Sequence, residues 1–96
     1  MNLVWSVYAL ADREAIFDHI ELENPRAAIA VDERIASHVE QLTQFPESGR
    51  PGRVESTREL VITHTPYLVA YCIRENAVYI LRVLHGSQQW PDVMTH

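Results

Sequence analysis

The chain of 96 residues has no lysine and only one cysteine, and each shortage excludes a class of proteins. All eight basic residues are arginine and the formal net charge is -5, so the chain as a whole has no attraction for nucleic acid. Any contact with RNA or DNA would depend on a local group of arginines, whose planar guanidinium suits phosphate. Because Cys72 stands alone, the sequence excludes a disulfide framework and predicts a small core thiol instead.

Long apolar runs, metal-ligand spacings and glycine-rich loops are missing as well. No apolar run approaches the roughly 18 residues of a membrane span, and the first residues lack the pattern of a signal peptide. We therefore expect a cytoplasmic protein with no membrane partner. The histidines do not stand at metal-binding spacings, and no glycine pair opens a helix after a strand, so we expect no metal and no cofactor.

What the sequence does contain is a β-rich second half, residues 58–91, around which the rest can be organised. Three apolar runs follow one another at residues 60–63, 68–73 and 78–84, separated by short breaks with turn residues. Their valine, isoleucine, tyrosine and threonine content predicts three strands of an antiparallel meander. The third run is apolar at nearly every position except Arg82, which indicates a central strand covered on both faces.

The first half predicts one strand and two helices. Residues 3–8 alternate loosely, as a strand does, and from about residue 10 apolar positions recur at three and four. This first helix runs to about Glu23, with an inner side that comprises Ala11, Ala15, Ile16, His19 and Ile20. Asn24-Pro25 has the residue types that begin a helix, and Pro46 marks where the second helix stops. Its expected buried stripe comprises Ala28, Val31, Ile35, Val39, Leu42 and Phe45.

The element order is therefore β-α-α-β-β-β, with a loop at residues 46–56 before the meander. Two helices joined by one or two residues pack as an antiparallel hairpin. We predict one α+β domain over residues 1–96, in which the helical hairpin packs on one face of a small, mostly antiparallel sheet. The other face of the sheet should be at least partly open.

A group of arginine, histidine and aromatic residues on the predicted sheet is the candidate site. Arg58 opens the second strand, Arg82 lies near the end of the last strand, and His85 follows that end. Histidine transfers protons near neutral pH and arginine stabilises charge that develops on phosphorus, so these three are candidate catalytic residues for metal-free RNA cleavage. In an antiparallel meander Arg58 and His85 need not be far apart. The candidate substrate-binding residues are Arg50, Arg53, Tyr71 and Trp90.

Each candidate also has an ordinary structural interpretation. Arg58 is followed by Glu59 and can form an ion pair at a strand end, and His85 can bond a loop. The tyrosines can pack in the core or at its rim, and Trp90 can anchor the end of the chain on the sheet. The loop arginines can be solvated charges. The residues alone do not decide between these interpretations and a functional one.

Short strings along the chain resemble the RelE/ParE superfamily of toxins from type II toxin–antitoxin systems. Each string is common, and it is their order over nearly the whole chain that is specific. The strings are WS at 5–6, NP at 24–25, FPESGR at 45–50, TRELV at 57–61, PYLVAY at 66–71 and ILRVLHG at 80–86, with QQWP after it.

The resemblance implies a growth-inhibiting toxin that a cognate antitoxin neutralises, in a toxin–antitoxin hetero-oligomer. One branch cleaves mRNA in the ribosome, and by position Arg58 and His85 match its arginine and strand-end histidine, while Trp90 lies near its terminal aromatic residue. We expect this activity, with ribosome and mRNA as partners, His85 as general acid, and Arg58 and Arg82 as phosphate clamps. The other branch poisons DNA gyrase by protein binding without catalysis. The missing lysine and the negative charge favour that alternative, and a third is a fold that only binds antitoxin.

Overall fold

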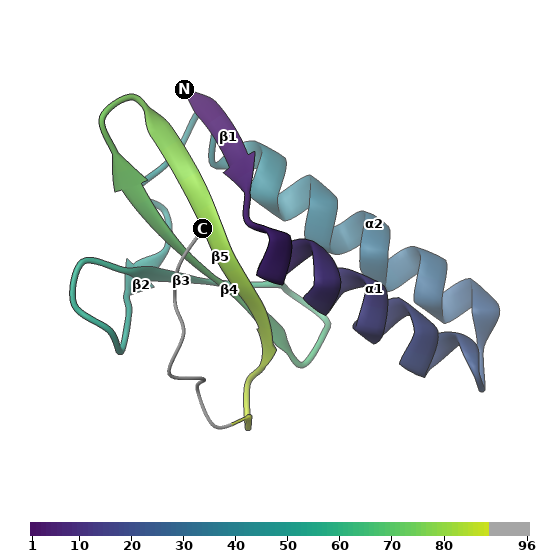
Figure 1. Ribbon diagram of the computed structural model, residues 1–96. Helices are drawn as coiled ribbons and strands as arrows, with labels where there is room; N and C mark the ends of the chain where they lie inside the picture. The colour runs from purple at the N-terminus through teal and green to yellow at the C-terminus, as the bar shows by residue number, and fades with distance from the viewer. Residues whose placement is uncertain (89–96) are drawn as a thin grey trace.

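A computed structural model of the chain describes residues 1–88, and Figure 1 shows its two helices on one side of a five-stranded sheet. The predicted order of elements is confirmed, with one short strand added inside the loop at 46–56. The elements are β1 (Asn2–Trp5), α1 (Val7–Glu21), α2 (Pro25–Gln41), β2 (Arg50–Pro51), β3 (Arg58–Val61), β4 (Tyr67–Arg74) and β5 (Ala77–His85).

The strands lie in the order β1-β5-β4-β3-β2, which places β5 between the first strand and the meander. β1 pairs with β5 in parallel, and every other pairing is antiparallel. Buried residues of β5 fall on both parities, as the run of apolar residues predicted. Within residues 1–88 the other face of the sheet carries no helix (Figure 1), so the predicted α+β architecture is confirmed.

The first helix begins earlier than the sequence pattern predicts, because Ser6 acts as its cap. The Ser6 hydroxyl accepts a hydrogen bond from the Ala9 backbone N–H at 2.9 Å, which satisfies one of the orphan donors of the first turn. The strand expected at residues 3–8 therefore ends at Trp5, and Val7 and Tyr8 belong to α1. Both residues are apolar or aromatic, which extended the strand-like alternation of the sequence, but both side chains are exposed on the outer side of the helix.

The second helix begins as predicted and ends earlier. The Asn24 side chain accepts from the Ala27 N–H, and Pro25 occupies the first helical position. The helix ends at Gln41, and turns of backbone then lead to Phe45, whose N–H bonds the Gln41 carbonyl. The expected stripe is buried at Ala28, Ile35, Val39 and Leu42 and partly buried at Val31, but its last member was wrong, because Phe45 is 63% exposed.

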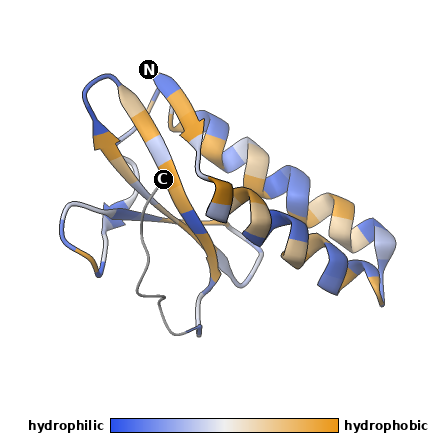
Figure 2. Cartoon of the chain, in the orientation of Figure 1, coloured by the Kyte–Doolittle hydropathy of each residue, from blue (hydrophilic) through white to orange (hydrophobic). Residues whose placement is uncertain are grey.

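The core lies between the helical hairpin and the facing side of the sheet. Figure 2 shows apolar residues along β4 and β5 and, alternating with polar ones, along both helices. The central cluster comprises Ala9, Ile35, Val39, Leu42, Ile62, Val69, Tyr71, Val78, Ile80 and Val83. Burial of apolar side chains in such a cluster is the main stabilising term in a domain of this size. On α1 the predicted inner side was displaced: Ala11 and Ala15 are exposed, and Ala9 is buried.

Beyond the end of β1, side chains and backbone around the start of α1 take over as hydrogen-bonding partners of β5. The Ser6 N–H donates to the Ile80 carbonyl at 2.9 Å, the Ser6 hydroxyl donates to the Leu81 carbonyl at 2.8 Å, and the Val83 N–H donates to the Asp12 carboxylate at 2.9 Å. The register against β4 jumps between Ile80 and Arg82, which leaves Leu81 as the extra residue of a bulge. This edge arrangement positions Arg82 beside α1.

Candidate functional site

Arg82, a predicted phosphate clamp, is held by Asp12 of α1. Its Nε donates to Oδ2 at 2.7 Å and its Nη2 donates to Oδ1 at 2.9 Å, a bidentate pair in which the two side chains are only 16% and 17% exposed. The hydrogen bonds that Arg82 donates to Asp12 raise the pKa of Arg82 above its ordinary value, so the guanidinium is charged at every physiological pH. The Nε and Nη2 groups of Arg82 are thus used in a contact within the chain.

Arg58, at the start of β3, holds the turn that leads into β2. Its Nη1 donates to the Gly49 carbonyl at 2.8 Å and to the Glu47 carbonyl at 3.3 Å, and its Nη2 lies 3.7 Å from the Glu47 carboxylate. Glu47 is 80% exposed, so the ion pair itself is weak, whereas the carbonyl contacts fix the path of the backbone. In this arrangement Arg58 organises a loop of its own chain.

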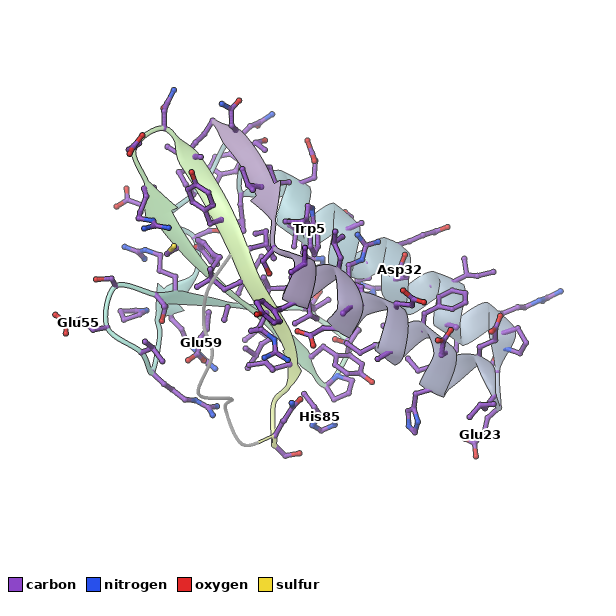
Figure 3. The ribbon with its side chains drawn as sticks, in the orientation of Figure 1. Trp5, Glu23, Asp32, Glu55, Glu59 and His85 are labelled. Carbon is purple, nitrogen blue, oxygen red and sulfur yellow. The ribbon has the colours of Figure 1, made fainter. Side chains whose placement is uncertain are left out.

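Arg50 and Arg53 meet at one buried carboxylate, that of Glu59 on β3. Arg50 donates from Nη2 to Glu59 Oε1 at 3.0 Å, and the Arg53 backbone N–H donates to Oε2 at 3.0 Å. Glu59 is 3% exposed, whereas the two arginine side chains are about half exposed. The two arginines thereby compensate the buried charge of Glu59 from the solvent side. Figure 3 shows Glu59 near β2.

Tyr71, a predicted base-stacking residue, lies in the core with no exposed surface. Its hydroxyl donates to the Pro46 carbonyl at 2.7 Å and accepts from the Gly49 N–H at 2.9 Å. Burial raises the pKa of this phenol above its ordinary value of 10.0, with the Gly49 bond opposing that effect in part. The ring packs among apolar side chains, and its hydroxyl anchors the same turn that Arg58 holds.

His85 is exposed at the end of β5, where Figure 3 labels it, and its ring meets the Tyr67 ring edge to face at 5.6 Å. The Ser87 backbone N–H donates to Nδ1 at 3.1 Å, and the Ser87 hydroxyl lies 2.8 Å from the same atom. A backbone N–H can only donate, so Nδ1 carries no proton and the neutral ring is protonated at Nε2. The side chain is accessible, and its tautomer is set by its own turn.

The sheet register separates the candidates. Arg58 stands opposite Tyr71, and His85 stands opposite Tyr67, four positions away along β4. At about 3.3 Å per residue and two strand spacings of about 4.8 Å, their Cα atoms lie roughly 16 Å apart. The meander left room for Arg58 and His85 to lie close together, and the register of the sheet instead sets them apart. Trp90 lies outside the described residues, and the roles assigned to all seven candidate residues stay predictions.

The carboxylate partners are what the sequence reasoning missed. The sequence reasoning named Glu59 only as a possible partner of Arg58 and did not consider Asp12, yet each bonds arginines that were assigned to a substrate. A signal was available for Glu59, an acid directly before an apolar strand run, and none for Asp12, whose partner is 70 residues away. In the part of the chain that the structure describes, no group of three metal-binding side chains occurs, and neither helix is long and apolar enough to span a bilayer.

Comparison with known proteins places this geometry in a family. The family model described as the ParE toxin of the type II toxin–antitoxin system parDE matches residues 3–90. The protein Y4kP of Sinorhizobium fredii is 46% identical over 90 residues, which covers 94% of this chain and 93% of that protein. Toxin RelE2 of Caulobacter vibrioides is 35% identical over 87 residues, covering 91% and 97%.

A solved structure has the same fold. It comes from the chromosomal ParDE toxin–antitoxin system of P. aeruginosa, with a TM-score of 0.82 and 28% identity, and the match covers 88% of this chain and 95% of that one. The sequence match and the structural match extend over the helical hairpin and the sheet alike. The chain therefore belongs to the ParE family of toxins, within the RelE/ParE superfamily of type II toxin–antitoxin systems.

Proposed function

We propose that this toxin arrests growth as a ParE-like inhibitor of DNA gyrase, acting by protein binding without a catalytic step. The observation that carries the proposal is the dispersal of the arginine and histidine set. Arg82 is paired with Asp12, Arg58 is bonded to the turn at 47–49, and His85 lies at the far end of the sheet from Arg58. A metal-free ribonuclease needs such groups converged on one phosphate, within hydrogen-bonding reach of the reacting atoms.

The hydrogen bonds of His85 also support a role outside acid catalysis. Its Nδ1 accepts from the Ser87 backbone N–H at 3.1 Å and lies 2.8 Å from the Ser87 hydroxyl, so this ring nitrogen is engaged by its own turn and is not presented to a substrate.

Charge supports the same proposal. The chain carries a formal net charge of -5, and three arginines of the sheet half are matched by carboxylates: Arg82 by Asp12, and Arg50 and Arg53 by Glu59. An mRNA-binding surface gains affinity from unneutralised cations that release counterions from the phosphates. A protein target does not require that term. As in the ParDE system that it resembles, the toxin would be held inactive by a cognate antitoxin.

The test combines two readouts on one purified protein. We expect the toxin to inhibit supercoiling of relaxed plasmid by DNA gyrase and to leave translated messages intact in primer-extension assays. The double variant R58Q/H85A should stay toxic when expressed without an antitoxin, with its fold checked by urea unfolding. Cleavage of messages at codon boundaries that disappears in this variant, together with unaffected supercoiling, would overturn the proposal in favour of mRNA cleavage.

A further inference from the structure

The clearest departure from the sequence pattern is Phe45, an aromatic residue that completes the stripe of α2 and yet faces solvent. It is 63% exposed, whereas Leu42, one turn earlier, is fully buried. The chain leaves the helix at Gln41, and the Phe45 N–H returns to the Gln41 carbonyl at 2.9 Å, which turns the ring away from the core. A large apolar side chain placed outward in this way is a candidate anchor for a partner.

The turn that presents Phe45 is fixed from beneath by buried groups. Tyr71 bonds both Pro46 and Gly49 through its hydroxyl, and Arg58 donates to the Gly49 carbonyl. A Cβ added at Gly49 would lie 2.6 Å from the Tyr71 hydroxyl oxygen, so only glycine permits this close approach. The segment after Phe45 is therefore held against the sheet rather than left as a free loop. An anchor that is ordered before binding loses less conformational entropy when it binds.

Two open hollows adjoin this turn and meet at Gln44. One, of about 340 Å³, lies along the end of α2, and the other, of about 360 Å³, lies along the turn itself. The end of α2 also lies beside the start of β1, where the Met1 ammonium donates to the Thr43 carbonyl (Figure 1). We call this surface the Phe45 face; its residues are Ser37, Glu40, Gln41, Thr43, Gln44, Phe45, Pro46, Glu47 and Ser48.

The Phe45 face is acidic as well as aromatic. Its lining residues include two carboxylates, Glu40 and Glu47, and no arginine. Glu47 is 80% exposed, and its contact with Arg58 at 3.7 Å is long. The carbonyl end of α2 adds partial negative charge at the same place. An exposed aromatic ring beside two carboxylates complements a partner that offers an apolar pocket bordered by cations.

We propose that the Phe45 face is the surface by which this toxin docks on its target, with Phe45 inserted between basic side chains of the enzyme's DNA-binding surface. This rests on the proposed function, because gyrase handles DNA and must present cations where DNA lies. Phe45 supplies the apolar anchor, and Glu40 and Glu47 pair with cations that otherwise contact phosphate. The toxin thereby competes for a surface on which the enzyme holds its substrate.

The decisive variant is F45A, measured in the supercoiling assay with full-length toxin. Because the ring is mostly exposed, its removal leaves the core unchanged, and the thermal midpoint should stay within about 2 °C of wild type. We expect the concentration for half-inhibition to rise about 30-fold, the scale of an interface hot spot. The matched control is L22A, which removes an apolar side chain that is 85% exposed at the turn between the helices, and it should shift inhibition by less than about twofold.

A charge reversal tests the second element. The variants E40K and E47K should each slow association with gyrase about tenfold at low salt and less at high salt, as expected for steering between complementary surfaces. E33K, an equal charge change at an exposed position of the same helix, is the control. Equal slowing by E33K would reduce the effect to net charge and overturn the role of the face.

The outcomes separate the inference from the function on which it rests. A wild-type toxin that leaves supercoiling untouched overturns both. A wild-type toxin that inhibits, together with an F45A variant that inhibits equally well, overturns the Phe45 face alone. If F45A loses antitoxin capture and still inhibits gyrase as strongly as wild type, the face serves the antitoxin, and the assignment to the target is overturned.

Discussion

The molecule places carboxylates beside arginines at two places on its sheet, here called the β5 end and the β3 end. The two arrangements differ in which of the paired side chains are buried. At the β5 end, Asp12 and Arg82 are both largely buried and form a one-to-one bidentate pair across 70 residues of chain. At the β3 end, Glu59 is buried, while its partners Arg50 and Arg53 are half exposed and lie within nine residues of it. The first pair joins a helix to a strand, and the second arrangement closes a local loop.

This difference determines what happens when one partner is lost. An arginine left behind at the β5 end has no water to replace Asp12, because only 16% of its side chain is exposed. An arginine left behind at the β3 end turns into solvent at little cost. When both partners of an ion pair are buried, loss of either partner should lower stability by a similar amount. When only one partner is buried, loss of the exposed partner should cost less than loss of the buried one.

The largest expected effect is that of D12A. The substitution strands the Arg82 guanidinium and removes the acceptor of the Val83 N–H, so we expect a loss of about 3 kcal/mol in the free energy of unfolding. R82A should be nearly as damaging, within about 1 kcal/mol, because it strands the partner carboxylate. Urea unfolding at neutral pH measures both.

Two further variants serve as controls for this prediction. D18A removes an exposed aspartate from the same helix and should change stability by less than about 0.5 kcal/mol. The double variant D12L/R82M replaces the pair by apolar side chains and should recover at least half of the loss, since no buried charge is left unpaired. A D12A protein as stable as D18A would show that the two ends of the sheet do not differ.

The β3 end should respond unequally. E59A removes the acceptor of Arg50 and of the Arg53 backbone N–H, and we expect it to cost about 2 kcal/mol. R50A removes one half-exposed partner and should cost less than about 1 kcal/mol. Urea unfolding of the two variants gives the ratio, and similar losses would contradict the asymmetry. Amide exchange at Arg53 should quicken in E59A and hardly change in R50A.

The sequence predicted the fold well because the fold follows from local signals. Asn24 is the N-cap of α2 and Pro25 is its first helical residue, and the apolar runs of the second half have the composition of strands. The errors arose where an apolar pattern continued beyond the end of the element that it predicted. Ser6 ends β1 and begins α1 inside a run that alternates like a strand, and Phe45 continues a helical period after the helix has stopped.

The candidate site was harder to predict, because it depends on pairings between distant residues. A single sequence shows that Arg82 is a charge in an apolar strand, but not that Asp12 lies beside it. It shows that Tyr71 is aromatic, but not that its hydroxyl holds the turn at Pro46 and Gly49. Strand order and register fix these contacts, and they also place Arg58 far from His85.

The smallest expected effect tests a neutral contact at the β3 end. Y71F keeps the buried ring and removes the hydroxyl that bonds Pro46 and Gly49, so it should cost about 1–2 kcal/mol at pH 7.

Below pH 10 the phenol is protonated in both the folded and the unfolded state and adds no pH dependence. Above it, the unfolded chain ionises while burial keeps the pKa of Tyr71 raised in the folded state, so wild-type stability falls as pH rises. Urea unfolding between about pH 8 and 11 should therefore show the difference between wild type and Y71F shrinking with pH. Y8F, at a 43% exposed tyrosine on α1, is the control, and a constant difference for Y71F would mean that the hydroxyl is not held where this structure has it.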